Sequence, residues 1–180
     1  MDKLYNLGDS VKTVGYILLL IAAILGAVIL YSVYQNLFAP ESSGNMAPDF
    51  ELEALNGTKI KLSNLRGYVV ILDFWATWCK PCRQEMPILG KIYDTYSSKG
   101  VVILSINIQE NKGTVAAFAQ AYKINWTILL DINGNIASKY KIKYIPTLII
   151  IDKNGCIKHK HIGVTQYNVL ASEIDSLLKG

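Results

Sequence analysis

Two cysteines, Cys79 and Cys82, form the part of the sequence best suited to chemistry. They follow the apolar run 68–74 and precede a helical pattern, so the first sulfur should lie at a helix N-terminus. There, free backbone N–H groups and the helix dipole stabilise a thiolate, and Lys80 adds a positive charge. Pro81 suits an early helical position, which needs no N–H. We therefore expect Cys79 to attack disulfides and Cys82 to resolve the mixed disulfide.

A zinc site is the alternative use of such a pair. A structural zinc ion needs four ligands, and the remaining candidates are Cys156, His159 and His161 on a distant predicted hairpin. A C-x-x-C pair beside a βαβ pattern is typical of redox chemistry, so we predict a redox-active disulfide with no metal and no other cofactor. We expect the two histidines to be a surface pair, with a metal site as the alternative. Cys156 should be a half-buried strand residue, with an intermolecular disulfide as its alternative.

Strand and helix signals alternate around the cysteine pair. Asn56-Gly57 is typical of a hairpin turn, and continuous apolar runs are typical of strands buried on both faces. We expect strands over 68–74, 101–106, 126–130, 147–151 and 156–162, and helices over 81–96, 115–122, 136–140 and 166–179. This order predicts an α/β fold with a central mixed sheet flanked by helices on both faces.

Composition points to a membrane segment. The 180 residues are 51% hydrophobic and 18% charged, with a formal net charge of +4. Ordinary soluble domains are about 25% charged. Disorder and a disulfide-dense scaffold are excluded, and the mild charge argues against nucleic-acid binding.

The excess hydrophobicity lies near the N-terminus, because residues 13–40 contain no charged side chain. The 21 residues 14–34 would span about 31 Å as a helix, close to the thickness of a bilayer core. A cleaved signal peptide is the alternative, but its apolar region would be shorter. We expect a cytoplasmic N-terminus (1–13), a transmembrane anchor (14–38), a linker (39–47) and a globular domain (48–180). Lys3 and Lys12 precede the span, and the next Lys or Arg is Lys59, which predicts a cytoplasmic N-terminus and an extracytoplasmic domain.

The stretch 73–87, Asp-Phe-Trp-Ala-Thr-Trp-Cys-Lys-Pro-Cys-Arg-Gln-Glu-Met-Pro, resembles the thioredoxin superfamily. More narrowly, it is similar to the membrane-anchored thiol-disulfide oxidoreductases of the TlpA/ResA/CcmG type. The segment 47–67 looks like that group's N-terminal β-hairpin region, and 107–140 occupies the place of its inserted βα segment. The resemblance therefore implies a thioredoxin-like fold preceded by one transmembrane helix.

The resemblance also assigns roles to residues around the cysteines. Tyr-Ile-Pro-Thr at 144–147 matches the superfamily's cis-proline loop, so Pro146 would be the cis-proline and would lie against the disulfide. The backbone of Ile145 would pair with an extended substrate. Trp78, Lys80 and Pro81 are the other candidates for substrate contact, although packing beside the active-site loop is the commoner role for an aromatic side chain such as Trp78. Some members carry an acid where this chain has Lys80, so their substrate preference does not transfer directly.

Asp73 is the main interruption of an otherwise apolar strand. Burial should raise the pKa of its carboxyl group, which could then relay a proton to or from Cys82. Many anchored members have Asn at this position, so Asp73 looks more like the general thioredoxins. Glu85 is expected to be a solvated helix residue, although the group has an acid there.

The function that the resemblance implies is a protein-disulfide reductase bound to the bacterial cytoplasmic membrane. Its partners would be exported proteins with disulfides, for example apocytochrome c in cytochrome c maturation, and a membrane electron donor of the CcdA/DsbD type. An oxidase or isomerase is one alternative, and a Cu(I)-binding metallochaperone-like module is another. A thiol peroxidase would use Thr77 with Cys79, but the proline expected between them is absent.

Overall fold

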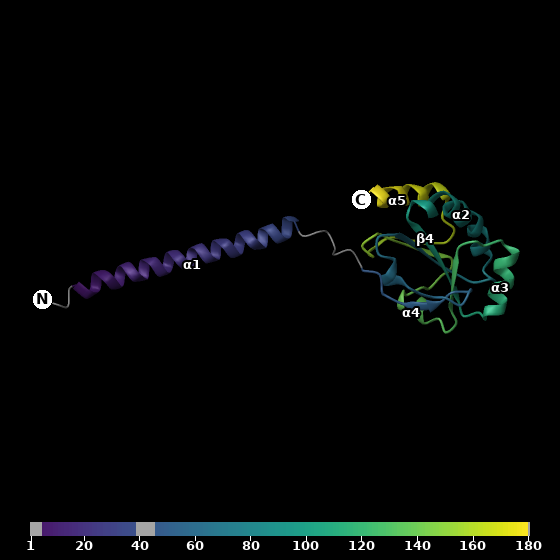
Figure 1. The fold of residues 1–180 in the computed structure, drawn as a ribbon, viewed down its shortest axis with the longest axis horizontal. Coiled ribbons are helices and arrows are strands. Elements are labelled where there is room, and N and C mark those ends of the chain that lie inside the picture. The colour runs from purple at the N-terminus through teal and green to yellow at the C-terminus, as the bar shows by residue number, and fades with distance from the viewer. Residues whose placement is uncertain (1–4, 39–45, 180) are drawn as a thin grey trace. The chain divides into compact units, whose positions relative to one another are not determined.

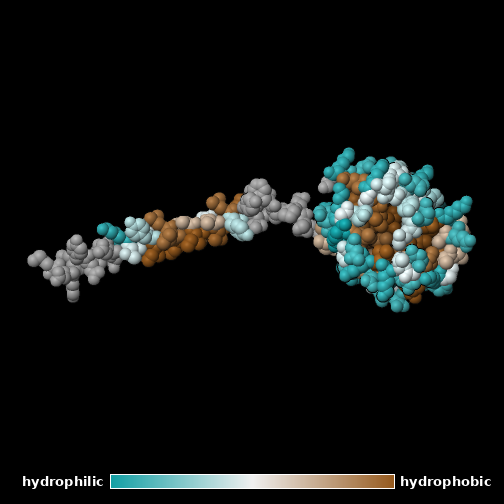
Figure 2. All heavy atoms as spheres, in the orientation of Figure 1, coloured by the Kyte–Doolittle hydropathy of each residue, from teal (hydrophilic) through white to brown (hydrophobic). Residues whose placement is uncertain are grey.

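The computed structural model describes residues 5–38 and 46–179, which belong to two compact units, Met1–Ser42 and Ser43–Gly180 (Figure 1). The first unit contains helix α1, Tyr5–Phe38. Within it, Lys12–Val33 is long and apolar enough to cross a membrane, and none of its most apolar window is buried in the protein. Figure 2 shows the hydrophobic surface of this segment. Residues 39–45 of the expected linker lie outside the described residues.

A five-stranded mixed sheet forms the centre of the second unit, with the order β5-β4-β3-β6-β7. The central strand β3, Val69–Trp75, is buried along its whole length. It pairs in parallel with β4, Val101–Ile108, and antiparallel with β6, Thr147–Ile151. At the edges, β5, Thr127–Asp131, runs parallel to β4, and β7, Ile157–Ile162, runs antiparallel to β6. The mixed sheet predicted from the sequence is confirmed.

A separate two-stranded hairpin packs on one face of this sheet. Strand β1, Glu51–Glu53, pairs antiparallel with β2, Lys59–Lys61, across the predicted Asn56-Gly57 turn. Gly57 has a φ of 88°, a conformation that glycine adopts without steric cost. The 3₁₀ helix η1, Leu62–Leu65, follows the hairpin. The short helix α4, Asn135–Lys139, packs on the same face through Ala137.

The opposite face of the sheet is covered mainly by two long helices. They are α2, Lys80–Tyr96, and α5, Tyr167–Lys179, whose buried side chains contact the alternate residues Val69 and Ile71 of β3. The 3₁₀ turn η2, Ser97–Lys99, ends the first of them. Helices therefore lie on both faces, as predicted.

Helix α3, Lys112–Ala121, packs near the carboxyl end of β3 through Val115 and Ala119. It begins three residues earlier than the apolar pattern predicts, because Asn111 caps it. The Asn111 side chain accepts a hydrogen bond of 2.9 Å from the backbone N–H of Thr114. All three hydrophobic clusters lie within the second unit, so this domain has a core of its own.

Candidate active site

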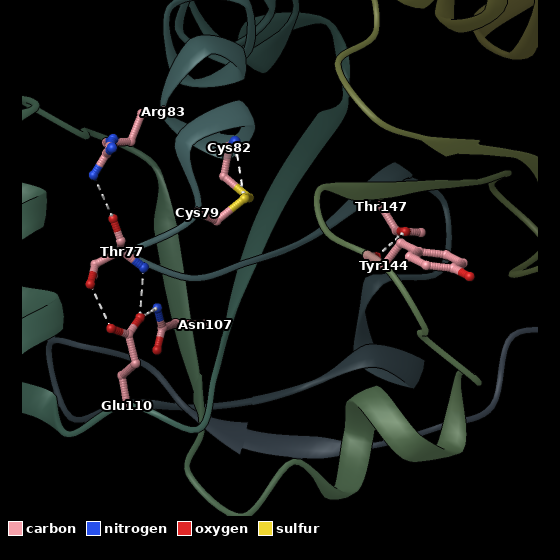
Figure 3. The surroundings of a disulfide bond; sticks show 8 residues. All are labelled: Thr77, Cys79, Cys82, Arg83, Asn107, Glu110, Tyr144 and Thr147. Carbon is pink, nitrogen blue, oxygen red and sulfur yellow. Dashed lines mark hydrogen bonds between the residues drawn. A yellow bond between two sulfur atoms is a disulfide. The ribbon is translucent and has the colours of Figure 1, made fainter.

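Cys79 and Cys82 form a disulfide at the N-terminus of α2 (Figure 3). Strand β3 ends at Trp75, and a short loop carries the chain to Cys79, which is the N-cap residue. Its sulfur accepts a hydrogen bond of 3.2 Å from the backbone N–H of Cys82, and Pro81 lies in the first turn. An electron-rich sulfur is favoured here because the first N–H groups of a helix have no intrahelical partners. The sulfur therefore lies where the sequence predicts it.

The two cysteines differ little in exposure, and both are shielded in the oxidised state. Cys79 is 4% exposed and Cys82 is 1% exposed. The neighbouring Trp78 is 70% exposed, and Lys80 is also exposed. The two sequence neighbours of Cys79 are therefore exposed, whereas its own side chain is buried.

The loop before β6 carries the expected cis-proline. The peptide bond between Ile145 and Pro146 is cis. Ile145 packs against the hydrophobic cluster that contains both cysteines. The Thr147 hydroxyl donates a hydrogen bond of 2.7 Å to the carbonyl oxygen of Tyr144, at the opposite end of the loop (Figure 3). The loop is thus held beside the cluster that contains the redox centre.

A carboxylate holds the segment that precedes Cys79. Glu110 accepts hydrogen bonds from the backbone N–H of Thr77 at 2.7 Å, from the Thr77 hydroxyl at 2.5 Å and from the Asn107 amide at 2.8 Å (Figure 3). Arg83 donates a hydrogen bond of 3.3 Å to the Thr77 carbonyl oxygen. Thr77 therefore directs its hydroxyl to Glu110, which does not support the peroxidase alternative. The sequence alone does not reveal this network, because its members come from separate elements.

Asp73 is buried in β3, with 1% of its surface exposed. It pairs in register with Ser105 of β4, whose hydroxyl donates a hydrogen bond of 2.8 Å to Oδ2. That hydroxyl in turn accepts a bond of 2.8 Å from the indole of Trp126. Oδ1 of Asp73 has no hydrogen-bond partner among the described residues. Burial raises the pKa of Asp73 to about 7, against the lowering effect of the Ser105 bond.

Glu85 corrects the expectation of a solvated residue, because it is 1% exposed. Its Oε1 accepts a hydrogen bond of 2.9 Å from the backbone N–H of Thr165, whereas Oε2 has no partner within the described part of the chain. Burial, and then the charge of Asp73, raise the pKa of Glu85 to about 8. The helical spacing indicates this burial, because Glu85, Met86 and Leu89 follow Cys82 at intervals of three, four and seven residues and therefore lie on one buried face of α2.

The two histidines and the third cysteine also differ from expectation. His159 and His161 are half-buried, and both contact Glu173 of α5, at 3.2 and 2.8 Å. Cys156 is fully buried at 1% exposure, with its thiol free. The pairing of β7 with β6 turns the histidines toward α5, which their sequence spacing alone could not reveal. Over residues 5–38 and 46–179, no group of three His, Cys, Asp or Glu side chains is arranged to hold a metal ion.

Comparison with known proteins gives a consistent assignment. Residues 43–160 match the AhpC/TSA family. The chain is 37% identical over 164 residues to the thiol-disulfide oxidoreductase ResA of Geobacillus thermodenitrificans, covering 89% of this chain and 92% of that protein. It is 38% identical to ResA of Bacillus subtilis over 144 residues, or 78% of each chain.

Solved structures show the same likeness. A Chlorobium tepidum protein described as a thiol:disulfide interchange protein DsbE superposes with a TM-score of 0.71 at 34% identity, over 75% of this chain and 96% of that one. StoA of Bacillus subtilis superposes with a TM-score of 0.62 at 30% identity, over 70% and 96%. The fold, the disulfide at the start of α2 and these relatives agree. This chain belongs to the AhpC/TSA family of thioredoxin-like proteins, and within it to the ResA-like thiol-disulfide oxidoreductases.

Proposed function

We propose that this chain is anchored in the cytoplasmic membrane by α1 and reduces disulfides in exported proteins on the outer side. The observation that carries the proposal is the disulfide between Cys79 and Cys82 at the N-terminus of α2. The names of the ResA relatives support thiol-disulfide exchange. The apolar segment Lys12–Val33 supports the anchor, and the lysines that precede it support a cytoplasmic N-terminus.

The chemistry begins with the reduced protein. The Cys79 thiolate attacks one sulfur of the substrate disulfide, which breaks that bond, forms a mixed disulfide and releases one substrate thiolate. Cys82 then loses its proton and attacks the sulfur of Cys79, which re-forms the Cys79–Cys82 disulfide and releases the second substrate thiolate. Both released thiolates take up protons from water. The substrate gains two electrons and the protein loses two.

The proton of Cys82 needs an acceptor inside the protein, because this residue is 1% exposed. Asp73 and Glu85 are buried acids with pKa values of about 7 and about 8, which lie close to the pKa of a thiol. Such groups can accept a proton at neutral pH and return it. We assign the proton transfer to this pair, with Asp73 retained from the sequence prediction and Glu85 added.

The surroundings of Cys79 suit a peptide substrate. Trp78, Lys80 and Pro81 are exposed around it, and Ile145 lies on the loop that packs beside the disulfide. We assign these four residues to substrate contact and Pro146 to shaping the loop. An extended chain lying along Ile145 would bring its own disulfide toward Cys79.

Two partners complete the proposal. The oxidised protein needs two electrons for each turnover, and a membrane donor of the CcdA/DsbD type would supply them. The substrate class we favour is apocytochrome c, whose haem-attachment cysteines must be free thiols. The resemblance of residues 73–87 to the TlpA/ResA/CcmG-type oxidoreductases supports this choice.

The reduction potential of the Cys79–Cys82 couple tests the direction of the reaction. We expect the domain Ser43–Gly180, equilibrated with dithiothreitol, to give a value near that of thioredoxin, about −270 mV. A value near about −120 mV would make the chain a disulfide donor instead. Cys79→Ser is the control, and it should show no two-electron couple. A peptide with an oxidised Cys-x-x-Cys-His segment then tests the substrate, and failure to reduce it would contradict the cytochrome assignment alone.

A further inference from the structure

A groove of about 560 Å³ lies beside the redox centre. Its lining includes Trp78 and Ile145, which are the sequence neighbours of Cys79 and of Pro146. Gln109, Ser138 and Lys143 are among its polar lining residues. A larger hollow of about 670 Å³ lies at the start of β5. Neither hollow is lined by a cysteine, but only the smaller one is lined by sequence neighbours of Cys79 and Pro146. A ligand that occupies the smaller groove would therefore contact Trp78, which directly precedes the reactive Cys79 in the sequence.

Two exposed aromatic side chains border the groove. Trp78 is 70% exposed and Tyr144 is 67% exposed, and both line it. Large aromatic side chains are enriched where proteins bind other polypeptides. Trp78 directly precedes Cys79 in the sequence, so the groove reaches the neighbourhood of the redox centre.

The charge of the groove is positive and uncompensated. Lys143 is the single charged residue among those that line it. In the described part of the chain, no carboxylate lies within ion-pair distance of Lys143, nor of the exposed Lys80 beside Cys79. Two ammonium groups without partners attract an acidic group from outside the protein.

A polar side chain in the groove is held in an unusual conformation. Gln109 has a φ of 57°, which non-glycine residues seldom adopt and which occurs preferentially at functional sites. Its side chain lies over Gly134, since a Cβ at that glycine would come 3.0 Å from Nε2. The amide group can both donate and accept hydrogen bonds, as the backbone of an extended peptide requires.

We propose that this groove binds an extended segment of the disulfide-bonded substrate, and that it selects segments carrying Asp or Glu near the reactive cysteine. The inference rests on the proposed reductase function and adds a substrate preference to it. Lys143 pairs with the acidic side chain, Gln109 bonds the substrate backbone, and Trp78 and Tyr144 pack against the segment on either side.

Peptide binding to the oxidised domain Ser43–Gly180 tests the inference without any redox step. Three fluorescently labelled peptides are compared, each with Ser in place of the reactive cysteine. They differ only in the two residues that flank this Ser, which are both Glu, both Gln or both Lys. We expect the Glu peptide to bind about threefold to tenfold more tightly than the Lys peptide, the range expected when a like-charge contact replaces one exposed ion pair. The difference should vanish at about 1 M salt, where the Debye length is about 3 Å.

Two charge-reversal variants then locate the effect. Lys143→Glu should remove or invert the preference, whereas the matched control Lys91→Glu, on the exposed face of α2 outside the groove, should keep it. Equal affinities of the three peptides for the unaltered domain would overturn the inference. So would a Lys143→Glu variant that keeps the preference for Glu.

A separate assay distinguishes failure of the inference from failure of the proposed function. The unaltered domain, once reduced, should reduce bis(2-hydroxyethyl) disulfide, which is small and uncharged. Reduction of this compound together with equal peptide affinities would leave the reductase function in place and remove only the acidic preference. A clear preference for the Glu peptide without any reduction would support the groove and contradict the reductase.

Discussion

Replacing Asp73 by Asn tests whether the domain carries a destabilising buried acid. The carboxyl group is 1% exposed, and its pKa rises from an ordinary value of 3.8 to about 7. Asn has nearly the same shape and can still accept the Ser105 hydrogen bond, but it does not titrate. The variant therefore removes the ionisation and leaves the packing and the bond of 2.8 Å largely intact.

The sign of the effect follows from proton binding. Between about pH 4 and pH 7 the folded protein keeps the Asp73 proton while the unfolded chain releases it, so stability falls as the pH rises. Below this range both states are protonated, and above it both are ionised. A pKa raised from 3.8 to about 7 corresponds to about 4 kcal/mol, at about 1.4 kcal/mol for each pKa unit. We therefore expect the Asp73→Asn variant and the unaltered protein to have the same free energy of unfolding near pH 4. Near pH 8, the free energy of unfolding of the variant should be higher by up to about 4 kcal/mol.

Urea unfolding of the oxidised domain at about pH 4 and about pH 8 measures this difference. Asp94→Asn, at an exposed position on α2, is the matched control and should change stability little at either pH. A constant difference between Asp73→Asn and the unaltered domain across this range would refute the reasoning. A less stable variant near pH 8 would also refute it.

Glu85→Gln extends the test to the second acid. The charge of Asp73 contributes to the raised pKa of Glu85, so the two ionisations oppose each other. At about pH 9 each single variant then removes the repulsion as well as one burial cost. The double variant should gain less stability than the sum of the single variants. Strict additivity would show that the two carboxyl groups do not interact.

Three further predictions concern the cysteines and the loop before them. Cys82→Ser should accumulate a mixed disulfide between Cys79 and a substrate, visible on non-reducing gels, because nothing resolves it; equal trapping by Cys79→Ser would contradict the assigned order of attack. Glu110→Gln should lower the free energy of unfolding by about 1–2 kcal/mol, since the carboxylate accepts three hydrogen bonds. Glu51→Gln, at an exposed position, should leave the free energy of unfolding nearly unchanged. An equal loss of stability in both variants would argue against the network. Cys156 should resist alkylation in the folded, reduced domain and react only after unfolding, as mass spectrometry can show; fast labelling would contradict its burial.

The sequence predicted those parts of the fold that depend on local patterns. The apolar run 68–74 predicted a strand buried on both faces, and β3 is Val69–Trp75. The Asn56-Gly57 turn and the helix that begins beside Cys79 were also readable, because turn and cap chemistry involve residues close in the chain. In the second unit, strand and helix ends shifted by up to three residues, the largest shift being at α3, where the Asn111 cap decides the boundary. Helix α1 begins at Tyr5, nine residues before the expected membrane span.

The parts that were missed depend on contacts between distant elements. Glu110 and Thr77 are 33 positions apart, and Glu85 and Thr165 are 80 apart, so no short window contains either pair. The histidines likewise meet Glu173 only because α5 packs beside β7. Glu85 and the two histidines were expected in solvent, and each has its partner on another element.

The two buried acids connect the stability of the domain with its chemistry. In the part of the chain that the structure describes, no cation forms an ion pair with Asp73 or Glu85, and each keeps one oxygen without a hydrogen bond. Such groups cost the fold free energy at neutral pH, so a stabilising role does not account for them. Their raised pKa values do fit proton exchange with a buried thiol such as Cys82. Asp73→Asn and Glu85→Gln, which should gain stability near pH 8, should therefore also slow the attack of Cys82 on the mixed disulfide. A gain in stability with no loss of this rate would show that the two acids do not take part in the resolving step.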